Sequence, residues 1–144
     1  MLRKSMMVVL ATAAMAGPLA AESFEIKMLN KGEEGAMVFE PAFVAAMPGD
    51  EIVFVSVDKG HNAETIKGML PEGAETFKSA ISKDFSVVLE AEGVYGIKCT
   101  PHFALGMVAL IQVGSAANLE EAQTAKLIGK SKKRFEPLFA QVQQ

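Results

Sequence analysis

The stretch Cys99-Thr100-Pro101-His102-Phe103-Ala104-Leu105-Gly106-Met107 brings a thiol, an imidazole and a thioether into one short loop. Cys99 is the only cysteine of the 144-residue chain, and His102 is one of two histidines. Soft sulfur ligands favour Cu(I), imidazole accepts both copper oxidation states, and a trigonal His₂Cys set with a weak axial Met is a known copper arrangement. The loop therefore predicts a copper site with Cys99, His102 and Met107 as ligands.

The second histidine of such a set has to come from elsewhere in the chain. His61 is assigned to this role largely because no other histidine exists. It follows a predicted strand, and a two-sheet fold can bring the end of that strand beside the loop. We expect the Asn62 amide to brace the ligand loop or to bond the thiolate, and Pro101 to stiffen the loop. Thr100 is placed with them around the site.

Other chemistries fit the same residues less well. A structural zinc site uses four strong Cys, His or carboxylate donors, and a thioether is a poor zinc ligand. A cysteine nucleophile activated by histidine is a second alternative, but the third group that orients the base is missing from the motif. Taken singly, Cys99 could be a small buried hydrophobe and Met107 a core residue. The joint spacing favours copper.

The regions on either side of the loop read as short strands separated by turn signals. Pro48-Gly49-Asp50 is a strong turn, because Pro fixes φ at one corner and Gly accepts positive φ at the next. Residues 58–84 are expected to be mostly loop with one or two short strands. Many short strands at close spacing indicate a sandwich or barrel. The strands are predicted at residues 23–29, 37–39, 43–46, 51–57, 85–89, 94–98 and 107–113.

The segment after the strands has helical spacing. Asn118 is predicted to cap a helix, with Glu121 completing a capping box, and Gly129 is a natural stop. A second helix is expected within residues 132–142, where Pro137 should start or kink it.

The N-terminus has the layout of a secretory signal peptide. Basic Arg3 and Lys4 precede an apolar run over residues 6–16, which is shorter than the roughly 20 residues that span a bilayer. Small residues follow, and we predict cleavage after Ala21 on the general secretion route, with residues 1–21 as leader and 22–144 as one domain.

The leader holds two of the 14 basic residues and none of the 17 acidic ones, so the mature net charge is −5. Such a charge gives no support for nucleic-acid binding, and no membrane attachment is expected after cleavage.

These residues resemble the cupredoxins, the type 1 blue-copper family. The Cys-x₂-His-x₄-Met spacing is plastocyanin-like, whereas azurin has a longer Cys-to-His gap and amicyanin a shorter His-to-Met gap. The resemblance is closest to the pseudoazurin family, and the two-helix tail separates the chain from plastocyanin. The stretches that carry it are Glu25-Ile26-Lys27-Met28-Leu29-Asn30, Phe39-Glu40-Pro41, Pro48-Gly49-Asp50, Gly60-His61-Asn62, Tyr95-Gly96-Ile97-Lys98 leading into the copper loop, and Gly106-Met107.

The resemblance implies an eight-stranded Greek-key β-barrel or sandwich with two C-terminal helices, holding one copper ion that cycles between Cu⁺ and Cu²⁺. It implies a periplasmic, monomeric electron carrier without enzymatic activity. It also implies electron transfer in denitrification, from a c-type cytochrome to copper nitrite reductase or another redox protein. Docking is expected through an apolar patch ringed by lysines: Lys31, Lys59, Lys78 and Lys98 around Met37, Pro101 and Leu105. A copper carrier using the same ligands is the alternative.

Two features depart from the family pattern. The mature chain is acidic, whereas a docking surface of lysines suggests a basic protein, so the acidity has to lie away from the ring. The tail is also unusual, since a run of basic residues precedes Pro137. Both features bear on the identity of the redox partner more than on the copper site.

Overall fold

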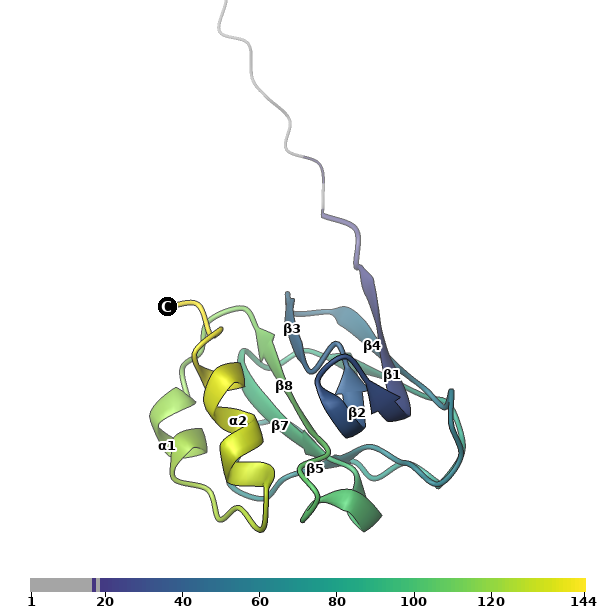
Figure 1. The fold of residues 1–144 in the computed structure, drawn as a ribbon. Helices are drawn as coiled ribbons and strands as arrows, with labels where there is room; N and C mark the ends of the chain where they lie inside the picture. Colours follow the sequence, from purple (N-terminus) through teal and green to yellow (C-terminus); the bar gives the residue numbers. More distant parts are fainter. Residues whose placement is uncertain (1–16, 18) are drawn as a thin grey trace, which may run out of the picture.

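The chain folds into two four-stranded sheets packed face to face, with two helices on one side (Figure 1). This computed structural model describes Gly17 and residues 19–144. The predicted leader residues 1–16 and 18 lie outside the described residues. One sheet has the order β2-β1-β4-β6, formed by Gly35–Glu40, Ser23–Gly32, Asp50–Val55 and Phe85–Leu89. The other has the order β3-β8-β7-β5, formed by Phe43–Ala46, Val108–Val113, Gly93–Lys98 and Glu64–Thr65.

This architecture confirms the predicted eight-stranded sandwich, although element bounds differ by a few residues. Strand β4 ends at Val55 instead of residue 57, and β1 continues to Gly32. Residues 58–84 contain only the two-residue strand β5 and an isolated bridge from Glu64 to Lys78, as expected for a mostly irregular segment. None of the helices in the described part of the chain is long and apolar enough to cross a bilayer.

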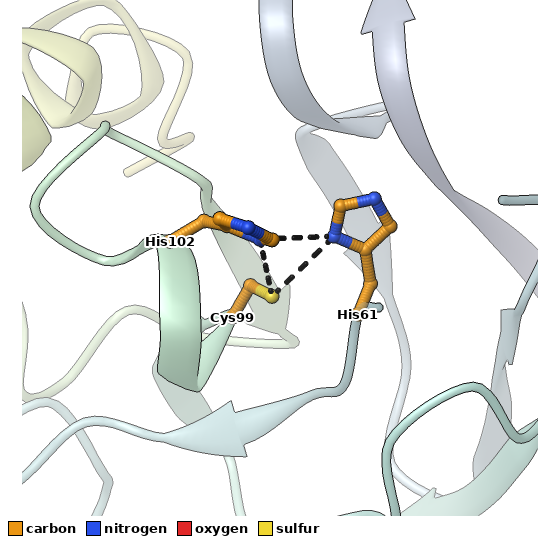
Figure 2. Close-up of side chains that lie close together, drawn as sticks. All are labelled: His61, Cys99 and His102. Carbon is orange, nitrogen blue, oxygen red and sulfur yellow. Dashed lines mark hydrogen bonds between the residues drawn. The ribbon is translucent and has the colours of Figure 1, made fainter. Parts of the chain in front are cut away.

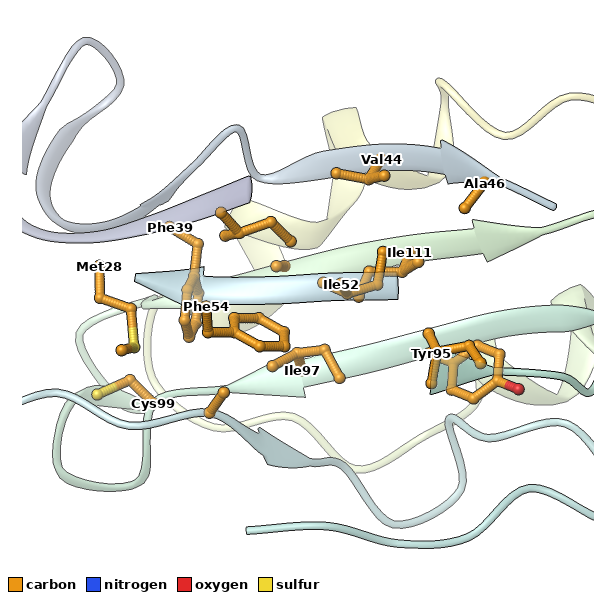
Figure 3. Packing of buried hydrophobic residues seen from close by; sticks show 14 of the residues in the cluster. Met28, Phe39, Val44, Ala46, Ile52, Phe54, Tyr95, Ile97, Cys99 and Ile111 are labelled. Carbon is orange, nitrogen blue, oxygen red and sulfur yellow. The ribbon is translucent and has the colours of Figure 1, made fainter. Parts of the chain in front are cut away.

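Apolar side chains from both sheets meet in the space between them (Figure 3). Strand β4 alternates buried and half-buried positions, as a strand with one face on the core should. The rings of Phe39 and Phe54 meet edge to face at 5.9 Å, an arrangement that aromatic quadrupoles favour. Cys99 and Met107 belong to this core, so the expected ligands sit at the edge of a packed interior.

A second apolar cluster joins the outer face of β7 and β8 to the helices. It explains why every residue of β8 is buried, since one face meets the opposite sheet and the other meets helix α2 (Ser131–Phe139). Phe135 of α2 is fully buried there, and burying a side chain of this size contributes about 1.5–3 kcal/mol. Leu138 packs in the same cluster.

The helical tail begins as predicted, but the reasons given for its ends are wrong. Helix α1 spans only Leu119–Gln123, so Gly129 does not end it. Asn118 makes no capping bond, because its side chain is used to bind β7: Oδ1 accepts from the Val94 N–H at 2.7 Å and Nδ2 donates to the Val94 carbonyl at 3.0 Å. Helix α2 begins at Ser131, well before Pro137, so it does not start late at the proline as one of the two alternatives predicted.

The strand order brings the predicted ligands to one end of the sandwich. Lys98 of β7 pairs with Val108 of β8, so residues 99–107 form the connection of a hairpin. In β5, Glu64 pairs with Lys98, which places the segment containing His61 beside Cys99.

Candidate metal centre

The loop between β7 and β8 is closed by its own backbone hydrogen bonds. The Cys99 N–H donates to the Met107 carbonyl at 3.0 Å, and the N–H groups of His102 and Met107 donate to the carbonyls of Cys99 and His102, each at 3.1 Å. Residues Thr100–His102 form a single 3₁₀ turn with Pro101 near its start. Gly106 has a φ of +89°, which glycine adopts without a side-chain clash. These contacts fix three predicted ligands relative to one another.

His61, Cys99 and His102 converge on one point (Figure 2). The Cys99 Sγ lies 3.5 Å from His102 Nδ1 and 3.7 Å from His61 Nδ1, and the two Nδ1 atoms are 3.1 Å apart. In a trigonal site with metal–nitrogen and metal–thiolate bonds of about 2.0 and 2.3 Å, the donor atoms would be roughly 3.5–3.7 Å apart. The two sulfur–nitrogen distances match this range, and the nitrogen–nitrogen distance of 3.1 Å is shorter, so the three donors lie close enough to share one metal ion.

Met107, the predicted fourth donor, lies in the same loop. It is fully buried and directly precedes β8, while its N–H is held by the His102 carbonyl. A trigonal His₂Cys set with an axial thioether suits copper, because sulfur stabilises Cu(I) and imidazole binds either oxidation state. Among the described residues, His61, Cys99 and His102 are the one cluster of three Cys, His or acidic side chains with metal-binding spacing.

A hydrogen bond from outside the loop orients His61. Its Nε2 lies 2.8 Å from the side-chain oxygen of Asn30, which only accepts hydrogen bonds. Nε2 therefore carries the proton, and the lone pair of Nδ1 faces Cys99 and His102. The Asn30 backbone N–H is in turn bound by Asp58 at 2.8 Å. Partners of this kind fix the tautomer and orientation of metal-binding histidines.

Burial acts on the two innermost ligands in opposite ways. Burial raises the pKa of the Cys99 thiol, and the backbone N–H groups of Asn62 and His102 oppose this shift. Burial, followed by the charge of nearby His102, lowers the pKa of His61, while the Asp58 carboxylate opposes this shift. The His61 ring is thus neutral and ready to bind a cation at neutral pH. The Cys99 proton has to be displaced by the metal.

The residues predicted around the site join the two ligand-bearing segments. The Asn62 side chain donates to Thr100 Oγ1 and accepts from the Thr100 N–H, both at 2.8 Å. Thr100 Oγ1 donates to the Glu64 carboxylate at 2.6 Å. Asn62 thus braces the loop through its side chain, while its backbone N–H faces the thiol. Pro101 lies exposed in the 3₁₀ turn.

His102 is half-buried, and two of the predicted docking residues, Pro101 and Leu105, lie in the same loop. Pro101, Ala104 and Leu105 are exposed beside it, and Leu105 shows 46% of its surface. Met37 is half-buried, and Lys31 and Lys59 are exposed.

The remaining two lysines share one carboxylate. Lys98 Nζ and Lys78 Nζ lie 3.8 Å and 4.0 Å from Glu64 Oε2. Lys98 Nζ also lies 5.0 Å from the centre of the Phe103 ring, within the range of a cation–π contact.

Sequence reasoning missed the residues that support the ligands from a distance. Asn30 and Glu64 are ordinary polar residues in the sequence, and only strand pairing brings them to the site. Two serines hold the His61 segment: Ser82 Oγ accepts from the Gly60 N–H, and Ser79 Oγ accepts from the Ala63 N–H, both at 2.8 Å. The one available signal was that Asn30 ends a stretch that matches the pseudoazurin family.

The sandwich fold and the closed His₂Cys–Met set define a class of small copper protein. The family model for copper binding proteins of the plastocyanin/azurin family matches residues 26–114. The chain is 55% identical over 130 residues to pseudoazurin of Paracoccus pantotrophus, covering 90% of each chain. It is 50% identical to pseudoazurin of Methylorubrum extorquens, covering 88% of this chain and 86% of the relative.

Solved structures agree with these relatives. The refined crystal structure of pseudoazurin from Methylobacterium extorquens AM1 superposes with a TM-score of 0.81 at 49% identity, covering 84% of this chain and 99% of that one. Native pseudoazurin from Hyphomicrobium denitrificans gives a TM-score of 0.81 at 41% identity, covering 85% and 99%. The chain therefore belongs to the pseudoazurins, within the plastocyanin/azurin family of copper-binding proteins. Copper is its cofactor, and His61, Cys99, His102 and Met107 form a typical site for it.

Proposed function

We propose that the protein is an electron carrier that holds one copper ion through His61, Cys99, His102 and Met107 and passes single electrons through the edge of His102. The observation that carries this proposal is a buried, closed donor set with one half-exposed ligand. His61, Cys99 and Met107 are fully buried, whereas His102 reaches the surface among exposed Pro101 and Leu105. Copper, when bound, supplies the one-electron couple.

The protein's own contribution is to keep the ligands in place while the charge changes. Backbone bonds close the ligand loop, Asn30 fixes the His61 ring, and Asn62 ties the two segments together. A rigid donor set suits both oxidation states and leaves little to rearrange when an electron arrives. Four protein donors also leave no open position for a substrate, unlike a catalytic metal site.

The same burial disfavours the two other candidate functions. A copper carrier should expose its ligands to a partner that removes the metal, but three of the four are fully buried. A cysteine nucleophile must contact its substrate, and Cys99 has no exposed surface. We therefore rank copper delivery second and cysteine catalysis last.

The surface around His102 is the proposed docking face for redox partners. An apolar collar allows close approach, and Lys31 and Lys59 would steer an acidic partner and raise the association rate more than the affinity. We propose that a c-type cytochrome donates the electron and that copper nitrite reductase, or another redox protein of denitrification, accepts it. The leader pattern supports a periplasmic location for this exchange, and we propose that the mature domain acts as a monomer.

Copper addition to the purified mature protein tests the centre. Cu(II) should give the intense blue absorption of a thiolate-to-copper transition, and Cys99→Ser should abolish it without unfolding the domain. A colourless wild-type protein, or colour that survives Cys99→Ser, would overturn the proposal.

Exchange kinetics separate the electron carrier from the copper carrier. The reduced protein is mixed with nitrite reductase, and electron and copper transfer are followed separately. An electron carrier should be oxidised many times faster than it loses copper. Copper loss at the same rate as oxidation would favour the carrier instead.

A further inference from the structure

A buried carboxylate lies against the first residues after the predicted leader. Asp50 is the first residue of β4 and shows only 5% of its surface. Its Oδ1 accepts a hydrogen bond from the Glu22 backbone N–H at 2.8 Å, and its Oδ2 accepts one from the Met47 N–H at 2.7 Å. No basic side chain within the described residues forms an ion pair with it. The charge is therefore balanced by two amide dipoles alone.

The groups around Asp50 are also acidic. Glu51 follows it in sequence, and the Glu51 N–H donates to the Glu22 carbonyl at 2.9 Å. The Glu90 carboxylate lies beside Gly49 in the same turn. The side chain of Glu22 adds a further negative charge. A cation placed at the Glu22 nitrogen would thus meet the buried Asp50 carboxylate directly, without a competing basic side chain paired to it.

The chain leading to this point is accessible. Leu19, Ala20, Ala21 and Glu22 are exposed and belong to no helix or strand, and Figure 1 shows this short segment extending away from the start of β1. Removal of the residues before Glu22 therefore breaks no strand pairing, since β1 begins at Ser23.

We propose that Asp50 is the binding site for the α-ammonium group created when the Ala21–Glu22 bond is hydrolysed. Water adds across the peptide bond, the leader departs with a carboxylate on Ala21, and the Glu22 nitrogen is protonated. The N–H that now lies 2.8 Å from Asp50 Oδ1 becomes part of a charged group, so processing converts a hydrogen bond into an ion pair. This inference rests on the proposed export and cleavage, but not on the copper centre.

The ion pair would make the processed domain more stable than the uncut chain. An α-amino group has an ordinary pKa of about 7.7–8.0, and a neighbouring carboxylate raises it in the folded state. The stabilisation is therefore complete below the unfolded pKa and is lost as the pH rises through the folded value. A rise of one pKa unit corresponds to about a tenfold gain in the folding equilibrium constant.

The test compares two copper-loaded proteins, each released from an N-terminal fusion without extra residues. One begins at Glu22 and the other at Ala21, which moves the charge one residue away. At pH 7 the unfolding equilibrium constant in urea should be about tenfold smaller for the Glu22 form. The difference should disappear near pH 10 and in the matched pair carrying Asp50→Asn. Equal stability of the two forms, or a difference that survives Asp50→Asn, would overturn the proposal.

Two further measurements complete the test. If Asp50→Asn does not fold, NMR titration of the Glu22 α-amino group in the unsubstituted protein decides: a raised pKa supports the ion pair and an ordinary one overturns it. The mass of the exported protein should correspond to a start at Glu22, and another start overturns the proposal. The blue absorption reports the copper site independently, since Asp50 begins β4 whereas His61 lies in the segment beyond its far end. Its absence would count only against the proposed function.

Discussion

Asn62 and Thr100 bond each other twice across the metal centre, with both contacts at 2.8 Å. Asn62 follows His61 and Thr100 follows Cys99, so this reciprocal pair joins the two segments that carry the ligands. Two contacts fix rotation as well as distance. The spacing between the His61 and Cys99 donor atoms is therefore held by the protein itself.

Replacing Asn62 should loosen this link. Asn62→Ala leaves the Thr100 N–H without its partner, and an unsatisfied polar group costs about 1–3 kcal/mol. We expect a loss of roughly 2–3 kcal/mol in the free energy of unfolding, measured in urea, together with faster copper release to a chelator. Thr100→Val is the matched control, because it removes the hydroxyl but keeps the backbone contact, and it should cost about 1 kcal/mol. Wild-type stability of Asn62→Ala would refute the bracing role.

The Asn30 side chain should control copper affinity through the His61 tautomer. Asn30→Leu removes the acceptor of the Nε2 proton, so the ring can rotate or place its proton on Nδ1, which blocks the metal. Loss of such a partner typically lowers metal affinity about 10–100-fold. Asn30→Asp, which keeps an acceptor oxygen, should retain most of the affinity. Competition with a chelator of known copper affinity measures both variants, and equal affinity of Asn30→Leu and wild type would contradict the prediction.

The copper loop could be predicted from sequence because its chemistry is local. Cys99, His102 and Met107 are close in the chain, and their types and spacing carry the inference. His61 could be assigned only because the chain has no other histidine. Asn30 and Glu64 could not be predicted as supporting residues, since their roles depend on the pairing of β1 with β4 and of β5 with β7.

The strands could also be predicted because their signals are local in the sequence, whereas the ends of the helices could not. Alternating apolar residues and turn signals report the period and limits of a strand directly. Asn118 has the sequence signature of a helix cap, but its amide forms two bonds to Val94 of β7. A tertiary contact thus outcompeted a local one, and no pattern near Asn118 reveals that its partner lies on a strand.

The Met107 side chain should set the reduction potential of the copper site. Its thioether is a soft donor in a buried position. Met107→Leu keeps the volume and removes the weak fourth donor. Because Cu(II) prefers a higher coordination number than Cu(I), a three-donor site favours Cu(I) and the potential should rise. Met107→Gln offers a harder oxygen donor that favours Cu(II), and the potential should fall. Redox titration of the blue absorption measures both shifts. Shifts of the same sign in the two variants would show that packing, and not ligation, sets the potential.

Asp50 should make stability depend on acid pH. The N–H groups of Glu22 and Met47 lower the pKa of its carboxyl below the ordinary value. The folded pKa is thus below the unfolded one, so the stabilisation is complete above about pH 3.9 and is lost as the pH falls through the folded value. Asp50→Asn should lower the melting temperature at pH 7, and the gap from wild type should narrow as the pH falls below about 4. Melting curves that remain parallel from neutral to acid pH would exclude this role.

The four lysines of the proposed docking face should contribute unequally to partner association. Lys78 and Lys98 lie beside the Glu64 carboxylate, whereas neither Lys31 nor Lys59 has an acidic partner within 4.0 Å among the described residues. A lysine without an acidic neighbour attracts an acidic partner more strongly than one whose charge is offset. Lys31→Ala and Lys59→Ala should therefore slow association with nitrite reductase about twofold to threefold at low salt. The same change at Lys78 or Lys98 should have a smaller effect.

Substitution of Glu64 provides the opposite test. Glu64→Gln keeps an oxygen for the Thr100 hydroxyl but removes the charge that offsets both lysines, so association should become faster. Stopped-flow rates at several salt concentrations measure these effects, which should all fade as the Debye length shortens to about 3 Å at 1 M salt. Equal effects of all four lysines would mean that Glu64 does not reduce the contribution of Lys78 and Lys98 to the association rate. A rate that is insensitive to salt would place docking on the apolar collar around His102 alone.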